Sequence, residues 1–244
     1  MKTSMFDAPA VSPSISTLTG SGGQGRRSIQ ETVYDALRES ILNLTLPPNS
    51  EISEKDMAVR YAVSRTPVRE AFIHLAQEGL IRVVPQKRTL VSLIDFARVE
   101  QEFFLRERLE LAVLELFLQN SSEQDFTDME NLIDKQQQAV ESGNYLELMT
   151  YDDAFHRILY TVAKQPLCNN VVEMMNGHYY RVRLLTTWIS GIAGDVVIQH
   201  RHILNALRQG NLDEARHLLT AHLGKLTVEE KILRIEFPTF FTAS

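Results

Sequence analysis

One carboxylate and three imidazoles are spaced along the chain in a way that suits metal coordination. Asp152 and His156 lie four residues apart in the segment YDDAFHRIL, so they share one face of the segment if it is helical. His200 in IQHRHIL and His222 in LTAHLGK follow on later segments. Brought together from three helices, these side chains suit a divalent transition metal such as zinc or nickel. An Asp and a His at this spacing also occur as surface pairs, so the spacing alone leaves both interpretations open.

A second group of residues has the types and the position needed to bind phosphate. The stretch VSRTPVREA, residues 63–71, places Arg65, Thr66 and Arg69 at the first turn of an expected helix. Helix N-termini present unpaired N–H groups and a partial positive charge, which favours phosphate there. Arginines on a helix are often only solvated, and it is the grouping of these three residues that favours contact with DNA.

The elements around this stretch predict a DNA-binding domain. A capping box at Ser28 begins a helix, and helices near 54–61 and 64–77 follow, the last ending at Gly79. Residues 80–84 and 89–93 have the pattern of two strands. The apolar stripe of the third helix consists of Val68, Ala71, Phe72 and Leu75. Three helices followed by a hairpin with a basic tip predict a winged helix-turn-helix, whose recognition helix enters the major groove of DNA.

Residues 37–91 resemble the N-terminal domain of bacterial transcription regulators of the GntR family. The resemblance rests on LPPN, VSRTPVREA and EGL, each at its expected place. It implies that Arg65 and Arg69 contact bases or phosphates, and that Ser64 and Thr66 contact phosphate. It also implies that Lys55 braces the DNA backbone.

The expected wing departs from the family pattern at one position. Members of the family commonly carry glycine where this chain has Arg88. A glycine allows the backbone to approach the minor groove closely. Lys87 and Arg88 are instead expected to bind phosphate or a narrow minor groove.

From Asp95 onward the pattern is almost wholly helical. Helices are expected near 95–119, 123–142, 145–164, 166–188, 194–209 and 211–236. Segments rich in Gly, Asn, Ser and Pro separate them, and the sequence shows no strand signal and no repeat of fixed period. An all-α bundle is therefore the expected architecture of this part.

This helical part resembles the effector domain of the FadR subfamily, the FCD type. The resemblance is carried by FLRERLELAVLEL, DDAFHRILYTVAKQPL and QHRHILNALRQGNLDEARHLLTAHL. It implies that Asp152, His156, His200 and His222 are the ligands of a divalent metal. The remaining candidates nearby, Asp153, His202 and His217, fall outside the pattern and are expected to be solvated or to lie behind the ligands.

A metal with four protein ligands leaves coordination positions open for water or for a small organic acid. Arg106 is the first candidate for a clamp on the carboxylate of such an effector, because a guanidinium binds carboxylates with two donors. Tyr180, Arg181 and Arg183 are further candidates. A surface or interhelical salt bridge is the alternative role for each of these arginines.

Composition agrees with a two-part regulator. The chain of 244 residues has a net charge of −6, but residues 26–91 carry 10 basic against 8 acidic residues and residues 92–244 carry 14 against 22. Apolar runs are shorter than the roughly 18 residues of a membrane helix, so no membrane association is expected. Cys168 is the single cysteine and cannot form an internal disulfide, which favours the cytoplasm.

The predicted fold is mainly α and is divided into three parts. Residues 1–27 are a flexible tail, 28–94 a winged helix-turn-helix, and 95–238 an all-α domain for effector binding and dimerisation. The predicted function is a homodimeric transcription regulator whose binding to palindromic operator DNA is controlled by a small organic acid. A repressor that the acid relieves is the first hypothesis, and an activator is the alternative. The alternatives are a metal sensor and a metal-dependent hydrolase. No nucleophile motif supports catalysis, and an enzyme is not expected.

Overall fold

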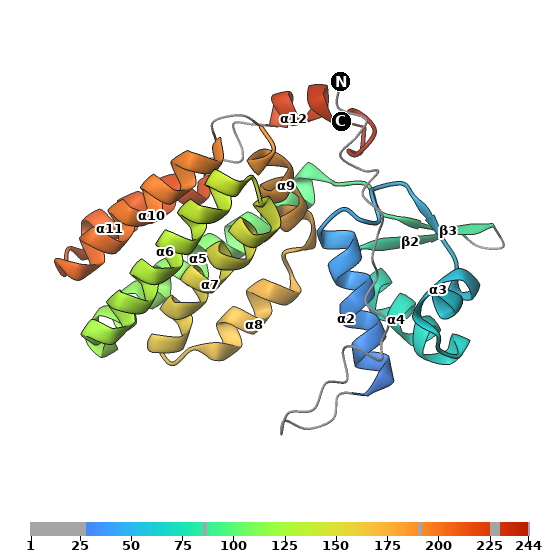
Figure 1. The fold of residues 1–244 in the computed structure, drawn as a ribbon, viewed down its shortest axis with the longest axis horizontal. Coiled ribbons are helices and arrows are strands. Elements are labelled where there is room, and N and C mark those ends of the chain that lie inside the picture. The colour runs from blue at the N-terminus through green and yellow to red at the C-terminus, as the bar shows by residue number, and fades with distance from the viewer. Residues whose placement is uncertain (1–27, 85–86, 190–191, 225–229, 244) are drawn as a thin grey trace. The chain divides into compact units, whose positions relative to one another are not determined.

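The computed structural model of the chain describes residues 28–84, 87–189, 192–224 and 230–243, and it forms two compact units (Figure 1). One unit runs to Ile94 and includes the residues from Thr239 onward, and the other spans Asp95–Pro238. Helices dominate the described residues, and strands occur there only in a small sheet of the first unit. The expected mainly α fold class is confirmed.

Three helices of the first unit follow their local sequence signals. They are α2 (Ile29–Leu42), α3 (Glu54–Tyr61) and α4 (Arg65–Gln77). The capping box at the start of α2 is present, because the Ser28 hydroxyl accepts from the Glu31 N–H while the Glu31 carboxylate accepts from the Ser28 N–H. Ala62 ends α3 in the left-handed conformation with φ 54°, which makes the tight turn that leads to α4.

The sheet of the first unit has three strands rather than the two that the sequence predicts. Strands β1 (Glu51–Ile52), β2 (Ile81–Val84) and β3 (Arg88–Val91) are antiparallel in the order β1-β3-β2. The pair Val84 and Arg88 closes the hairpin, and the pair Glu51 and Leu90 adds β1 to the other side of β3. The prediction missed β1 because two residues are too few to show the period-2 alternation of a strand.

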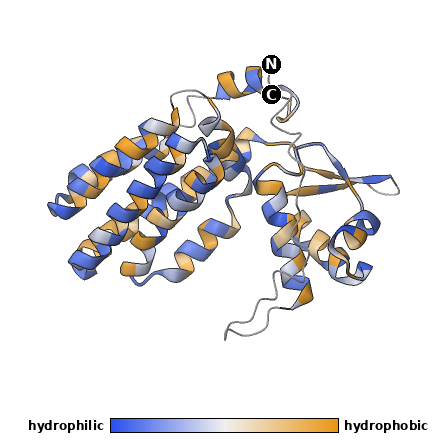
Figure 2. Cartoon of the chain, viewed as in Figure 1, coloured by the Kyte–Doolittle hydropathy of each residue, from blue (hydrophilic) through white to orange (hydrophobic). Residues whose placement is uncertain are grey.

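The second unit is a bundle of helices around an apolar core. Its first four helices are α5 (Phe96–Asn120), α6 (Glu123–Ser142), α7 (Tyr145–Val162) and α8 (Pro166–Met174). They are followed by α9 (Gly177–Thr187), α10 (Ile192–Arg208), α11 (Leu212–Gly224) and α12 (Glu230–Glu236). Figure 2 shows hydrophobic and hydrophilic residues alternating along these helices, as amphipathic helices require. Phe117, Phe155, Leu159 and Leu219 are among the fully buried residues of the core.

The helix expected over 166–188 is two helices, and this prediction was wrong. The break lies at Met175 and Asn176, between α8 and α9. The first backbone N–H groups of α9 are bound from another helix, since Glu102 of α5 accepts from His178 N and Tyr179 N at 2.8 Å each. A carboxylate at a helix N-terminus stabilises a new helix start. This contact joins residues far apart in the sequence, so no local sequence pattern predicts it.

The helix expected over 211–236 lies partly outside the described residues. Helix α11 ends at Gly224 and α12 begins at Glu230, and the part of the prediction over 225–229 lies outside the described residues. Among the helices that the structure describes, none combines the length and the apolar character needed to cross a membrane.

Candidate functional site

Three helices of the second unit bring the four expected metal ligands together. Asp152 and His156 lie on α7, His200 on α10 and His222 on α11. One potential ligand atom from each residue lies within 4.8 Å of the others. Asp152, His156 and His200 are buried and His222 is half-buried. The structure therefore gathers at one interior point the side chains that the sequence singled out, and their role as ligands stays a prediction.

The distances between these atoms suit a transition metal. His222 Nε2 lies 3.2 Å from His200 Nε2 and 3.3 Å from His156 Nε2. The two carboxylate oxygens of Asp152 lie 3.6 Å from His200 Nε2 and 3.8 Å from His156 Nε2. Donor atoms bound about 2.1 Å from one ion would be roughly 3.0–3.4 Å apart at adjacent octahedral or tetrahedral positions. A small closure of the cluster would bring all four atoms to a single ion.

Each imidazole is oriented by a hydrogen bond at its other nitrogen. Nδ1 of His156 bonds to a Glu110 carboxylate oxygen at 2.6 Å, and Nδ1 of His200 to the Gln136 amide oxygen at 2.7 Å. Nδ1 of His222 bonds to the side-chain oxygen of Gln199 at 2.9 Å. These acceptors place the proton on Nδ1 and leave a lone pair on each Nε2.

The donor set itself fits a cation. With the three protons on Nδ1, the Nε2 lone pairs and the Asp152 carboxylate face one another, an arrangement that repels unless a positive ion occupies its centre. Burial lowers the pKa of His200 to about 3 and also lowers that of His222 well below its ordinary value. Both imidazoles are therefore neutral at neutral pH, the state in which imidazole binds metal.

The carboxylates of the site are held in their charged form. Burial by itself would raise the pKa of Asp152, but Arg183 and the nearby imidazoles outweigh it, and the pKa lies below its ordinary value. The pKa of Glu110 is likewise raised by burial but lowered to about 2 by Arg106 and His156 together. Asp152 is thus available as an anionic ligand, and Glu110 as an anionic acceptor for His156.

Replacing Gln136 with leucine is expected to weaken metal binding by about 10- to 100-fold. Gln136 is fully buried, its oxygen orients His200, and its amide nitrogen donates to Tyr151 O at 3.2 Å. Leucine would leave the His200 N–H without its acceptor and the ring free to rotate. Competition titration of zinc against a chelator measures the affinity. Gln138→Leu on the exposed side of the same helix is the control, and equal affinities in both variants would disprove the orienting role.

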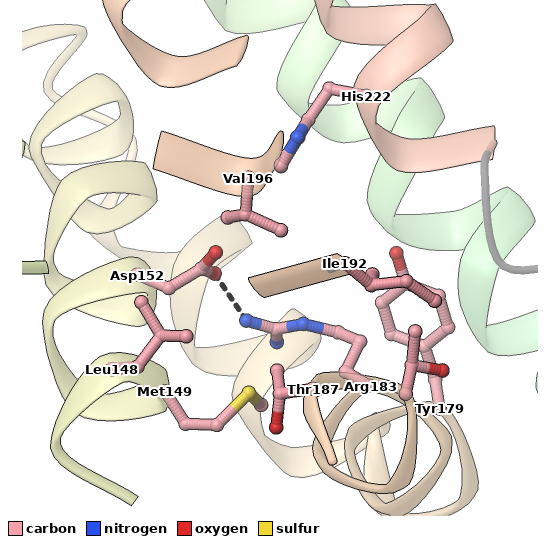
Figure 3. Close-up of a pocket in the computed structure, with 10 residues that line it drawn as sticks. Leu148, Met149, Asp152, Tyr179, Arg183, Thr187, Ile192, Val196 and His222 are labelled. Atoms are coloured by element: carbon pink, nitrogen blue, oxygen red, sulfur yellow. Dashed lines mark hydrogen bonds and ion pairs between the residues drawn. The ribbon is translucent and has the colours of Figure 1, made fainter. Parts of the chain in front are cut away.

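A cavity of about 50 Å³ adjoins the candidate metal ligands Asp152 and His222. Its polar lining includes Arg183 and Thr186, and its apolar lining includes Leu148, Met149, Ile192 and Val196. Figure 3 shows Arg183 reaching from α9 toward Asp152, to which it is hydrogen-bonded. The volume exceeds that of a single water site several times, so the cavity can hold a few waters or a small acid of similar size.

Only one of the four predicted effector-binding residues lines this cavity, and it is Arg183. Arg106, the first candidate, is buried and paired with Glu110 at 2.6 Å, on the His156 side of the cluster. Arg181 is fully buried, and its Nε donates to the Gly177 carbonyl at 3.0 Å. Tyr180 is half-buried, with the Arg183 guanidinium 5.8 Å from the centre of its ring. The structure favours Arg183 over Arg106 as the residue nearest an effector.

Sequence reasoning missed the residues that orient the imidazoles. Glu110, Gln136 and Gln199 lie on α5, α6 and α10, and none was singled out. One signal was present for Glu110, because it lies four residues after Arg106, a spacing that allows the two side chains to pair on one helix face. The two glutamines resemble any polar residue of an amphipathic helix, so only their contacts identify them.

In the first unit, the expected DNA-contacting residues share an exposed surface at the start of α4. Ser64, Arg65, Thr66 and Arg69 are all exposed, while the apolar stripe of the same helix is buried. Ser64 is the N-cap of α4 and makes no side-chain capping bond, whereas Ser53, the N-cap of α3, accepts from Asp56 N. The hydroxyl at the start of α4 is therefore not used for capping, as a phosphate contact there would require.

The other expected DNA contacts are also exposed. Lys55 lies in the first turn of α3. Lys87 and Arg88 lie at the hairpin, where Lys87 N donates to Val84 O at 3.1 Å, while residues 85–86 of the expected wing lie outside the described residues. These positions are accessible to DNA, and the contacts themselves stay predictions.

Two family models match the chain. The model of the FCD domain matches residues 102–225, which include the four candidate ligands and the lining of the cavity. The model described as bacterial regulatory proteins, gntR family, matches residues 29–91, which include α2, the sheet and the start of α4.

Several relatives match this chain over most of its length. The HTH-type transcriptional repressor RspR of Escherichia coli K12 is 30% identical over 214 residues, which are 88% of this chain and 94% of that protein. An uncharacterized HTH-type transcriptional regulator of Streptomyces ambofaciens is 32% identical over 216 residues, 88% of this chain and 90% of its own. The solved structure of E. coli McbR/YncC has the same fold, with a TM-score of 0.71, 22% identity and coverage of 86% of this chain and 99% of its own.

Proposed function

Because this chain belongs to the gntR family of bacterial regulatory proteins and carries an FCD domain, we propose that it is a transcription regulator controlled by a metal-bound organic acid. Family and relatives are DNA-binding transcription regulators, which confirms the expectation of a regulator rather than an enzyme. The metal, the acid and the homodimer are the proposed parts of the function.

The observation that carries the metal proposal is the convergence of three Nε2 lone pairs and one carboxylate. Imidazole ligands suit zinc and nickel, whereas magnesium and calcium prefer oxygen ligands. Asp152, His156, His200 and His222 would hold the ion. When bound, it would supply positive charge and open positions for an oxygen ligand.

The cavity supports a small carboxylate as the effector. It reaches two of the candidate ligands, and Arg183 at its wall adds a cationic group that is buried and hydrogen-bonded to Asp152. A carboxylate entering the cavity would therefore meet the metal at one end and lie close to a guanidinium. A neutral solute would gain neither interaction.

Control of DNA binding requires that the acid distinguish two states of the regulator. In a homodimer, two winged domains would read the halves of a palindromic operator. The acid can shift operator occupancy only to the extent that it binds one arrangement of these domains more tightly than the other. RspR is named a repressor, and we propose repression relieved by the acid for this chain.

Thermal unfolding of the metal-loaded protein in a panel of small carboxylates tests this function. An acid present at about 100 times its dissociation constant should stabilise the protein by roughly 2.7 kcal/mol, because it binds only the folded state. We expect the stabilisation to disappear in His156→Ala/His200→Ala, which lacks two candidate ligands.

The unfolding data distinguish an acid that binds through the metal from the alternatives. An acid that stabilises both proteins equally would show that it does not bind through the metal. A wild-type protein that binds metal but responds to no acid would support a second function, a metal sensor. The small volume of the cavity favours that alternative, since a few waters could complete the coordination of the ion.

A further inference from the structure

We propose that Thr186 recognises the effector, and that the effector is a monocarboxylate with a second, uncharged oxygen such as a hydroxyl. This inference rests on the proposed function and specifies the class of acid that the cavity takes. It assigns Thr186 a role in specificity, separate from the metal ligands and from Arg183.

Thr186 belongs to the cavity wall, and its hydroxyl lacks a hydrogen-bond partner in the part of the chain that the structure describes. Thr186 is only 3% exposed and is part of the cavity wall, and its Oγ1 has no hydrogen-bond partner among the described residues. A buried threonine on a helix usually donates to the carbonyl three or four residues earlier. The neighbouring Thr187 does so, with its hydroxyl 2.7 Å from Leu184 O. Buried hydroxyls are rarely left unpaired, so a ligand is the natural partner for Thr186.

The position of Thr186 relative to the metal site indicates where the ligand carries its second oxygen. It lies three residues after Arg183 on α9, so both side chains share a face of that helix. Arg183 bonds to Asp152, a candidate ligand, and both residues line the cavity together with Thr186. The hydroxyls of Tyr179 and Thr187, which also belong to the wall, already donate to backbone carbonyls. The apolar part of the wall includes Leu148 and Val196. A short ligand with a carboxylate at the metal and an oxygen toward Thr186 fits this lining.

Charge in the buried cluster favours a single carboxylate. Glu110 pairs with Arg106, and Asp152 and Asp153 both pair with Arg183. Three carboxylates against two guanidiniums leave one net negative charge, which a divalent ion converts to one net positive charge. One carboxylate neutralises this charge, whereas a dicarboxylate would leave an uncompensated negative charge in a buried site. The second oxygen should therefore be neutral.

Four three-carbon acids test the inference with the full-length, nickel-loaded protein. Propionate has no further oxygen, lactate and 3-hydroxypropionate each add one hydroxyl, and malonate adds a second carboxylate. Calorimetric titration measures each affinity, and fluorescence of Trp188, the single tryptophan, gives a second signal close to Thr186. We expect the better of the two hydroxy acids to bind about tenfold more tightly than propionate and more tightly than malonate.

Substitutions at Thr186 and Thr187 test whether the Thr186 hydroxyl causes the preference for a hydroxy acid over propionate. Thr186→Val keeps the side-chain shape and should reduce the ratio between hydroxy acid and propionate to about one, while Thr186→Ser should keep the ratio. Thr187→Val should change the ratio far less, because that hydroxyl already bonds within its helix. A ratio unchanged in Thr186→Val would mean that the ligand hydroxyl binds the metal instead, and would overturn the inference. Tighter binding of malonate than of both hydroxy acids would overturn the monocarboxylate class.

Failure of the inference differs from failure of the proposed function. If all four acids bind the nickel-loaded protein with no preference linked to Thr186, the metal-anchored carboxylate survives and the role of Thr186 is refuted. If none binds although nickel is present, both are refuted.

Discussion

Replacing His200 with alanine is expected to lower the affinity for zinc or nickel by more than about 100-fold, since loss of a residue that only orients a ligand already costs 10- to 100-fold. His200 is fully buried, and its Nε2 lies 3.2 Å from His222 Nε2 and 3.6 Å from an Asp152 oxygen. Removing it takes away one donor and opens the cluster to solvent. Metal content after dialysis and competition with a chelator measure the loss.

The chain offers a matched control on the same helix. His202 lies two residues from His200 and is exposed, and His202→Ala should bind metal as the wild type does. Because alanine at a buried position can also destabilise the bundle, His222→Ala provides a second test at a half-buried ligand, with exposed His217→Ala as its control on α11. Wild-type affinity in folded His200→Ala and His222→Ala would refute the metal centre.

Loss of metal should also remove the response to the acid but not operator binding itself. The candidate DNA-contacting residues and the candidate ligands belong to different compact units, so each set can be altered without removing the other. An operator selected from random DNA with the wild-type protein provides the probe. His200→Ala should bind it and no longer respond to the acid that stabilises the wild type.

Replacing Arg65 or Arg69 with alanine is expected to have the second large effect, on operator binding. Both residues are exposed in the first two turns of α4, while Val68, Ala71 and Leu75 of the same helix are buried. A two-donor contact from arginine to guanine contributes about 1–3 kcal/mol, which corresponds to roughly 5- to 150-fold in affinity. In a homodimer each substitution removes the contact from both halves of the operator. The double variant Arg65→Ala/Arg69→Ala should therefore show no detectable operator binding. Electrophoretic mobility shift measures the affinity.

Salt dependence separates base contacts from phosphate contacts. A residue that binds phosphate adds affinity for any sequence, and its loss makes binding less dependent on salt. A residue that reads a base changes the preference for that base pair instead. Exposed Arg201→Ala in the second unit is the control for loss of a positive charge, and thermal unfolding checks that the fold is intact. Unchanged operator affinity in both the Arg65→Ala and Arg69→Ala variants would refute the assignment.

Much of the fold followed from signals that act within a few residues of the chain. The capping box at Ser28 and the helix ranges expected over 54–61 and 123–142 are such signals, and the structure contains the capping box, α3 at Glu54–Tyr61 and α6 at Glu123–Ser142. Such signals are reliable because a cap bonds to backbone groups two or three residues away, whatever the rest of the chain does. The exposed arginines of α4 follow in the same way from the apolar period of that helix.

The candidate metal site depends both on the local spacing of residues along one helix and on how the helices pack together. The i,i+4 spacing of Asp152 and His156 set their common face, and the family resemblance indicated His200 and His222 as partners. Their orientation was beyond the sequence, because Glu110 lies 46 residues from His156 and Gln136 lies 64 residues from His200. Contacts at such separations depend on which helices pack together, and no pattern along a single helix encodes them.

The sequence by itself indicated a two-part organisation, a candidate DNA-reading helix and the residue types of a candidate metal site, because these depend on local periodicity, capping and composition. Only the tertiary structure decided that Arg183 rather than Arg106 reaches the cavity, and that Thr186 faces it unpaired while Thr187 bonds to Leu184. The two threonines are adjacent and chemically identical. Both line the cavity, and they differ because the Thr187 hydroxyl bonds to a carbonyl of its own helix whereas the Thr186 hydroxyl has no partner among the described residues.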